Sequence, residues 1–166
     1  MDGWEPRRRR SPGHDWCIIR LGVSGSIEGV DIDTNHFLGN HPPFGSLDAV
    51  YAPDATPESL RDEVTWTRVL EQVPLKKGAQ NLFALKGEGR TYTHVRLNIY
   101  PAGGVARLRV YGRPEVEATE NEVDLACLNQ GAMALACSDM FFSPMNNLLL
   151  PQRADHMGQG LSLIHI

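Results

Sequence analysis

The stretch THVRLNIYPAGGVARLRVYG, residues 93–112, decides the fold. Val95, Leu97 and Ile99 alternate with polar residues, so one face of this segment is apolar and the other is polar. The same period of two returns in Leu108 and Val110, after four residues rich in proline and glycine. Because successive side chains of a strand point to opposite faces, both runs predict half-buried strands. The short connection between them predicts a β-hairpin.

Short strands are also predicted for much of the remaining chain. The segments with strand composition are Trp16–Leu21, Ile27–Thr34, Ser46–Tyr51, Thr65–Leu70 and Asn81–Leu85. Glycine and proline separate them at short intervals, and only Pro57–Val64 and Asp124–Cys137 have a helical composition. Short strands between regular turn signals predict an all-β protein, an antiparallel sandwich or jelly roll.

Composition narrows the class of protein. A chain of 166 residues has the size of one domain, with room for the beginning of another. The net charge of −4 argues against a nucleic-acid partner, because such binding depends on neutralising phosphates. No apolar run approaches the length of a membrane span, so we expect no membrane partner. Cys17, Cys127 and Cys137 contain no C-x-x-C pair, so we expect reduced, packed thiols in a cytoplasmic protein.

Four consecutive arginines, Arg7–Arg10, stand between the segment DGWEP and the segment SPGHDW. In an extended segment, Arg8 and Arg10 would share one face and Arg7 and Arg9 the other. One or two of them could clamp a carboxylate bidentately, or all four could be solvent-exposed and paired with nearby acids. Further candidates for the clamp are Arg96, Arg107 and Arg109.

His14 and Asp15 follow the arginines directly. A histidine beside an acid is a candidate base whose orientation the acid fixes. The pair could equally belong to a turn after Ser11–Gly13, and both readings stay open.

A second polar segment, DIDTNHFLGNHPP at residues 31–43, begins as an alternating strand and leaves it at Asp33. Polar groups just beyond a strand end, such as Asp33 and His36, are typical of a site loop on a rigid scaffold. They could instead only hydrogen-bond the backbone of a turn. The spacing of the acids and histidines here matches no familiar zinc pattern, so we expect neither a metal nor a cofactor.

Together these blocks resemble the allantoicase (allantoate amidinohydrolase) family. DGWEPRRRR, GHDW, IEGVDIDTNHFLGN and residues 93–112 occur in the family's order and cover nearly all of residues 1–112. The resemblance implies two homologous jelly-roll repeats of the galactose-binding-like type, in an enzyme of roughly twice this length. Residues 1–112 would be most of the first repeat without its opening strands, 113–133 a linker, and 134–160 the opening segment of the second repeat.

This division leaves the first jelly roll incomplete, with an exposed sheet edge. We therefore expect the C-terminal segment to dock into the vacant strand positions, as in a circularly permuted protein, and to bring Phe141, Phe142 and Leu148–Leu150 to the sheet. The last six residues, LSLIHI at 161–166, are also what a common transposase-based sequencing adaptor encodes in frame. We expect them to be adaptor read-through rather than a genuine final strand.

The resemblance implies the hydrolysis of allantoate to ureidoglycolate and urea in purine breakdown. This chemistry needs a cation for the carboxylate, partners for the ureido groups, and an acid and a base for proton transfer. A non-catalytic small-ligand or carbohydrate-binding module is the alternative. At full length we expect a homo-oligomer. The expected proton-transfer residues are His36, Asp33, His14 and Asp15, and the expected substrate-binding residues are Arg8, Arg10, Asn40, Arg96 and Asn98.

Overall fold

The computed structural model describes residues 3–86, 89–115, 123–141 and 143–151. Its strands are β1 (Asp15–Asp33), β2 (Phe44–Val50), β3 (Thr67–Pro74), β4 (Leu82–Ala84), β5 (Thr91–Tyr100), β6 (Arg107–Pro114), β7 (Val123–Asp124) and β8 (Met133–Cys137). The helix α1 (Pro57–Asp62) and the 3₁₀ turns η1 (Leu128–Gln130) and η2 (Met145–Leu149) complete the described elements. The expectation of a mainly antiparallel, jelly-roll-like β protein is confirmed.

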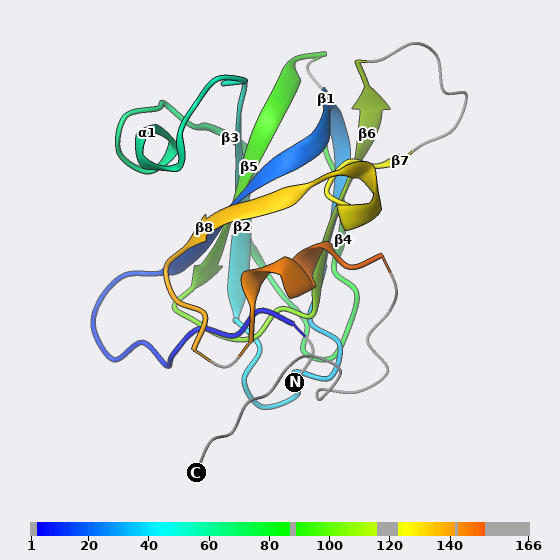
Figure 1. The fold of residues 1–166 in the computed structure, drawn as a ribbon. Coiled ribbons are helices and arrows are strands. Elements are labelled where there is room, and N and C mark those ends of the chain that lie inside the picture. Colours follow the sequence, from blue (N-terminus) through cyan, green and yellow to red (C-terminus); the bar gives the residue numbers. More distant parts are fainter. Residues whose placement is uncertain (1–2, 87–88, 116–122, 142, 152–166) are drawn as a thin grey trace.

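One long, bent strand organises the sheet (Figure 1). β1 contains both predicted strands of its region, and the strand order is β3-β2-β5-β1-β6-β7. Its first part, residues 15–20, pairs with β5 along one side and with β8 along the other. Its second part, residues 25–33, pairs with β6, and residues 29–31 also pair with β4. Because β1 passes from one set of strands to the other, both sets enclose a single core.

The bend in β1 depends on close backbone approach. A Cβ atom on Gly22 would lie 1.9 Å from the Gln130 carbonyl oxygen, and one on Gly25 would lie 2.3 Å from that of Arg113. Only glycine permits these contacts. The alternating apolar residues on either side of the bend pack together in one core. This core includes Ile19 and Ile32 of β1, Leu97 of β5 and Leu108 of β6.

The predicted hairpin is wrong in its pairing, although both of its strands exist. β5 and β6 lie on either side of β1 and are not neighbours in the described sheet. The connection between them finds other partners: Val105 bridges Trp4, and the Ala106 amide donates to the Asp33 carbonyl oxygen at 2.7 Å. Alternation therefore identified the strands and their apolar faces but not their partners. The prediction of half-buried strands is wrong, because polar residues of the other face are buried too, namely His94, Asn98, Arg107 and Arg109.

The two predicted helices had different outcomes. α1 is confirmed, and Thr56 caps it by accepting from the Ser59 amide at 3.2 Å. The predicted helix at Asp124–Cys137 is wrong, because this segment contains the end of β7, the 3₁₀ turn η1 and the strand β8. Gly131 adopts a left-handed backbone (φ 81°) between the last two, which ends the turn and starts the strand.

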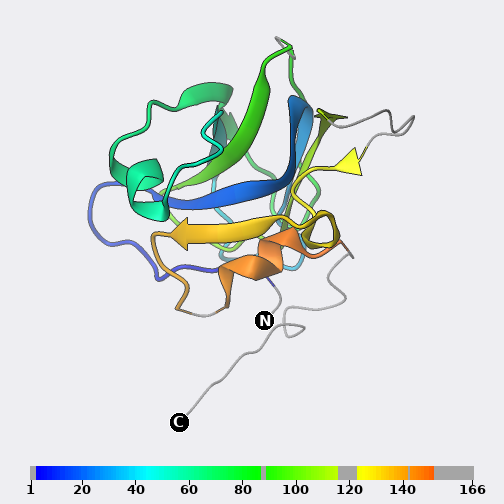
Figure 2. The same ribbon diagram turned by 45° about the horizontal axis from the view of Figure 1, so that its top comes forward.

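The C-terminal segment docks on β1, as expected (Figures 1 and 2). β8 lies along the first part of β1, and Leu148 and Leu149 of η2 are buried in the core. Phe141, in contrast, is largely exposed. Phe142 and residues 161–166 lie outside the described residues, and the division into two repeats with a linker stays a prediction. Among the described residues, no helix is long and apolar enough to cross a membrane.

Candidate functional site

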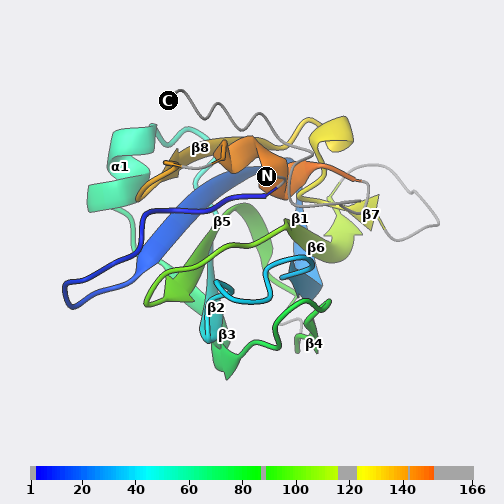
Figure 3. The same cartoon turned by 90° about the horizontal axis from the view of Figure 1, so that it is seen from below.

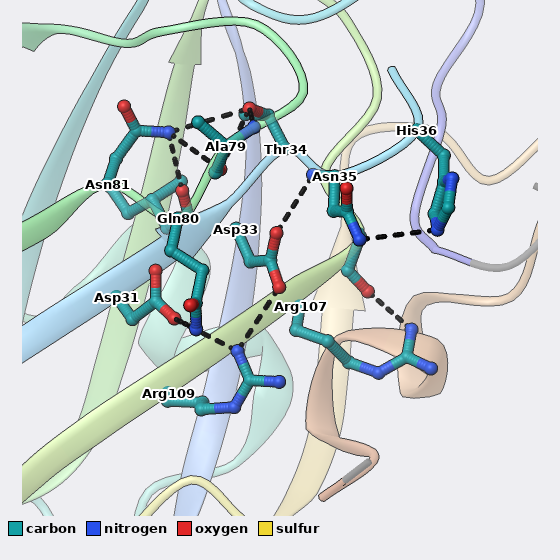
Figure 4. A network of polar contacts seen from close by, with 12 residues as sticks. Asp31, Asp33, Thr34, Asn35, His36, Ala79, Gln80, Asn81, Arg107 and Arg109 are labelled. Atoms are coloured by element: carbon teal, nitrogen blue, oxygen red, sulfur yellow. Dashed lines mark hydrogen bonds and ion pairs between the residues drawn. The ribbon is translucent and has the colours of Figure 1, made fainter. Parts of the chain in front are cut away.

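Two buried aspartates at the end of β1 share one arginine (Figure 4). In the register of β1 and β6, Asp31 lies opposite Arg109. The Arg109 Nη1 atom is 3.0 Å from Asp31 Oδ2 and 3.3 Å from Asp33 Oδ2. Both carboxylates are fully buried, so this arginine supplies the charge compensation that burial demands. We call Asp31, Asp33 and Arg109 the β1-end cluster.

The two acids of this cluster differ in their surroundings. Asp33 Oδ1 accepts the Asn35 amide at 2.8 Å, so both of its oxygens have partners. Asp31 accepts from the Gln80 side chain at 3.0 Å, but its Oδ1 has no hydrogen-bond partner among the described residues. Burial raises the pKa of Asp31, while the Gln80 hydrogen bond and Arg109 oppose the rise.

The loop after β1 holds His36 in an unusual conformation. Its φ of 68° lies in the left-handed region, which a residue with a Cβ adopts only at a cost. Asn35 Nδ2 donates to His36 Nε2 at 3.2 Å, which places the neutral ring's proton on Nδ1. Figure 4 shows Asn35 between His36 and Asp33, so the predicted histidine and aspartate are linked through this residue.

A buried amide that the sequence did not indicate as functional fixes this loop. Asn81 Nδ2 donates to the Ile32 carbonyl oxygen at 2.9 Å, and its Oδ1 accepts the Lys76 amide at 2.8 Å. Thr34 Oγ1 donates to the Lys76 carbonyl oxygen at 2.5 Å. The segment before β4 is thereby tied to the end of β1. Alternation placed Asn81 in a strand, and nothing local revealed these partners.

Glu5 and Asn40 connect the loop after β1 to the N-terminal segment. Asn40 Nδ2 donates to Glu5 Oε1, and Glu5 Oε2 has no hydrogen-bond partner among the described residues. Burial raises the pKa of Glu5, and the Asn40 hydrogen bond partly offsets this. Asn40, predicted to bind substrate, thus binds a carboxyl group of this chain.

The arginine segment, Arg7–Arg10, runs past the start of β1 and the residues after β8 (Figure 3). Trp4 Nε1 donates to the Asp139 carbonyl oxygen at 2.7 Å, and the Arg7 amide donates to the Asp139 carboxylate. Arg9 Nη2 lies 2.5 Å from Asp15 Oδ1. These contacts fix the segment at both of its ends.

Beside this segment lies a shallow depression of about 340 Å³. The exposed side chains of Arg8 and Arg10 have no hydrogen bond or ion pair to another described residue. Asp15 is buried there, and its Oδ2 has no hydrogen-bond partner among the described residues. Unpaired cations beside an unsatisfied acceptor suit a ligand that has both a carboxylate and N–H groups. The lining, which we call the arginine depression, consists of Arg7, Arg8, Arg9, Arg10, Ser11, Asp15, Ser138 and Asp139.

His14, Arg96 and Asn98 belong to a different group, which is centred on Asp48. Asn98 donates to Asp48 at 2.9 Å, and Arg96 Nη2 lies 3.0 Å from the same carboxylate oxygen. Arg68 pairs with the other oxygen. His14 Nε2 lies 3.3 Å from Asn98 Oδ1, and its ring packs on Tyr100 with centroids 4.7 Å apart. His14 does not line the arginine depression. The sequence feature that could have identified Asp48 as a site residue is its position as an acid in the middle of a predicted strand.

The predicted residues therefore fall into separate places. Arg8, Arg10 and Asp15 share the arginine depression, whereas Asp33 and His36 lie at and just beyond the end of β1. The side chains of Arg96 and Asn98 are engaged with Asp48. Among the described residues, no group of three or more histidines, cysteines or acids is placed to hold a metal ion.

Comparison with known proteins gives one consistent result. The family model of the allantoicase repeat matches residues 1–115. The chain is 51% identical over 164 residues to a protein of Photobacterium profundum named "Probable allantoicase", covering 96% of this chain and 48% of that protein. It is 48% identical to a protein of the same name from Pseudomonas aeruginosa, with the same coverage. The chain thus spans about half the length of the curated relatives that it matches.

Solved structures agree with these relatives. A structure titled "Structure of allantoicase" superposes with a TM-score of 0.63 at 40% sequence identity, covering 93% of this chain and 48% of that one. The allantoicase of Saccharomyces cerevisiae superposes with a TM-score of 0.60 at 38% identity, with the same coverage.

Proposed function

Because the chain belongs to the allantoicase family, we propose that the protein hydrolyses allantoate to ureidoglycolate and urea. The observation that carries this proposal is the match of the repeat model to residues 1–115 together with about half-identical relatives. The reaction replaces one ureido group on the central carbon of allantoate by the oxygen of water. The leaving nitrogen gains a proton and the attacking water loses one, so no oxidant or reductant is consumed.

We place the substrate in the arginine depression. Arg8 and Arg10 offer exposed guanidinium groups, which bind a carboxylate through charge-assisted, bidentate hydrogen bonds. The buried Asp15 Oδ2 has no partner among the described residues, and a small movement of the lining that uncovers it would let it accept a ureido N–H group. Asp15 is then the proton-transfer group nearest to the substrate. What supports this placement is that one depression combines cations and an acceptor that have no partner among the described residues.

The other predicted residues receive different roles in this proposal. Asp33 positions the following loop through the Asn35 amide, and His36 belongs to that loop, apart from the arginine depression. Asn40 orients Glu5, while Arg96, Asn98 and His14 support the sheet around Asp48. These assignments remain proposals, as do a homo-oligomeric state at full length and a cytoplasmic location.

Urea release from allantoate tests the activity, and calorimetric binding of allantoate tests the site. Arg8→Ala and Arg10→Ala should each raise the KM and the Kd by about tenfold or more, since one charge-assisted hydrogen bond contributes roughly 1.5–3 kcal/mol. Arg113→Ala is the matched control, because Arg113 is exposed, pairs only with Glu28 among the described residues, and lies outside the depression. Asp15→Asn should lower kcat more than it raises KM.

The outcomes separate the parts of the proposal. Urea release with unchanged KM in the Arg8→Ala, Arg10→Ala double variant would refute the site but not the activity. Tight allantoate binding without urea release would favour the alternative of a non-catalytic binding module, which the comparisons do not favour. The absence of both allantoate binding and urea release would refute the proposed function.

A further inference from the structure

Two cysteines lie directly opposite each other on neighbouring strands. In the antiparallel register of β1 and β8, Cys17 is the partner of Cys137. Both belong to the inward-facing side: Cys17 is a core residue, and Cys137 packs against the core. Both are free thiols in this structure. The two cysteines are 120 positions apart in the sequence, so their spacing along the chain did not indicate that they lie close together.

The hydrogen bonding around this pair shows which kind of cross-strand pair it is. The amide of Ser138, the residue after Cys137, donates to the carbonyl oxygen of Trp16, the residue before Cys17, at 2.8 Å. Hydrogen-bonded and non-hydrogen-bonded pairs alternate along an antiparallel ladder. Cys17 and Cys137 are therefore a non-hydrogen-bonded pair, in which Cα atoms are typically about 4.5 Å apart. Disulfides need a Cα separation of about 4.4–6.8 Å.

We propose that Cys17 and Cys137 form a disulfide when the protein meets a low-molecular-weight disulfide such as glutathione disulfide, which covalently joins β8 to β1. The half-buried Cys137 reacts first: its thiolate attacks one sulfur of glutathione disulfide and releases one glutathione. The Cys17 thiolate then attacks the Cys137 sulfur of the mixed disulfide and releases the second glutathione. Two thiols are oxidised, one glutathione disulfide is reduced to two glutathiones, and the two thiol protons pass to them.

Burial sets the rate of this reaction. It raises the pKa of Cys137 to about 11 and that of Cys17 well above its usual value. Little thiolate is therefore present at neutral pH, so oxidation is slow there and accelerates as the pH rises. The same burial protects the disulfide from reduction once it has formed.

The disulfide would act on the neighbouring depression. Ser138 and Asp139 follow Cys137 directly and line the arginine depression, and Asp139 holds the Arg7 amide and the Trp4 indole. Joining β8 to β1 therefore fixes one wall of the depression and the anchor of the arginine segment. This consequence rests on the proposed function, whereas the disulfide itself does not.

The test is oxidation of the folded protein with glutathione disulfide at pH 8.5, followed by peptide mapping without reduction. We expect a Cys17–Cys137 crosslink, a fall from three titratable thiols to one, and faster migration on a non-reducing gel. The thermal midpoint should rise and return to its starting value after dithiothreitol. Cys127→Ala, at the third cysteine, is the matched control and should oxidise like the parent protein.

Two results would overturn the proposal. One is a disulfide that involves Cys127, and the other is the absence of a crosslink in the folded protein while the unfolded chain oxidises. Cys137→Ala should keep two thiols and show neither the mobility change nor the rise in thermal midpoint. Because mapping is done on the parent protein, the result does not depend on whether a core variant such as Cys17→Ala folds.

Discussion

Removal of Arg109 should destabilise the fold strongly, because its charge compensates two buried carboxylates. Arg109→Met preserves much of the side-chain volume but leaves Asp31 and Asp33, both fully buried, without their cation. Breaking a buried ion pair from one side costs roughly 3–5 kcal/mol of unfolding free energy. For a chain of this size, that corresponds to a fall of roughly 6–20 °C in the thermal midpoint. Urea denaturation should show a lower transition midpoint with an unchanged m-value.

The pH dependence of this loss distinguishes charge from packing. Arg109 lowers the pKa of Asp31, so its removal raises that pKa further above the unfolded value of 3.8. Between these two values the folded variant binds more protons than the unfolded chain, and its stability therefore falls as the pH rises. The loss should be largest at pH 7 and shrink toward pH 4. Arg113→Met, which removes an exposed ion pair with Glu28, should cost less than about 1 kcal/mol. A loss at Arg109 below about 1 kcal/mol, or one independent of pH, would refute the reasoning.

Three further predictions concern single side chains. Burial lowers the pKa of His94 from 6.5 to about 4, so the unfolded chain takes up the proton at a higher pH than the folded protein does. The unfolding free energy should therefore fall by about 3 kcal/mol as the pH drops from 7 to 4. Urea denaturation of His94→Gln at several pH values should show that this pH dependence is lost. His36→Gly should leave the unfolding free energy within about 1 kcal/mol, because relief of the left-handed strain offsets the added backbone entropy. Urea release should change by less than about twofold, because His36 does not line the arginine depression and a proton-transfer group must reach the substrate; a large fall in turnover would contradict the placement of the substrate there. Trp4→Phe removes the hydrogen bond to the Asp139 carbonyl oxygen and should lower the unfolding free energy by roughly 1–3 kcal/mol. Hydrogen exchange of the Arg7 amide should then become faster. Unaltered exchange there would contradict the idea that Asp139 anchors the arginine segment.

The sequence predicted strands well where one face of the strand enters the core. Val95, Leu97 and Ile99 are buried as their alternation indicated, and so are Val30 and Ile32. The segment Asp124–Cys137 was misjudged because small apolar residues without a clear period suit a helix as well as a strand. There the pairing of β8 with β1 outweighed helix propensity.

The candidate site divides in the same way. The loop with Asp33 and His36 could be recognised, because polar groups just after a strand end are visible in the sequence. The arginine depression could be recognised only in part: Arg8, Arg10 and Asp15 are neighbours along the chain, whereas Ser138 and Asp139 come from the far end of it. Asp48 and Asn81 were missed because their partners lie on segments distant in sequence or are backbone groups.

The wrong prediction of the hairpin shows that alternation alone does not identify which strands pair. Three buried acids of the sheet have an arginine opposite them on a neighbouring strand. Asp31 faces Arg109 and Asp33 faces Arg107, both on β6. Asp48 faces both Arg96 and Arg68. β5 and β6 both carry arginines and neither carries an acid, so pairing them directly would supply no partner for those charges. A buried unpaired charge costs several kcal/mol. A slip of one residue would also turn each charge onto the opposite face of its strand. Charges on strand interiors therefore help to select both partner and register. Matching acids to arginines across candidate strands would have placed β1 beside β6 and β2 beside β5.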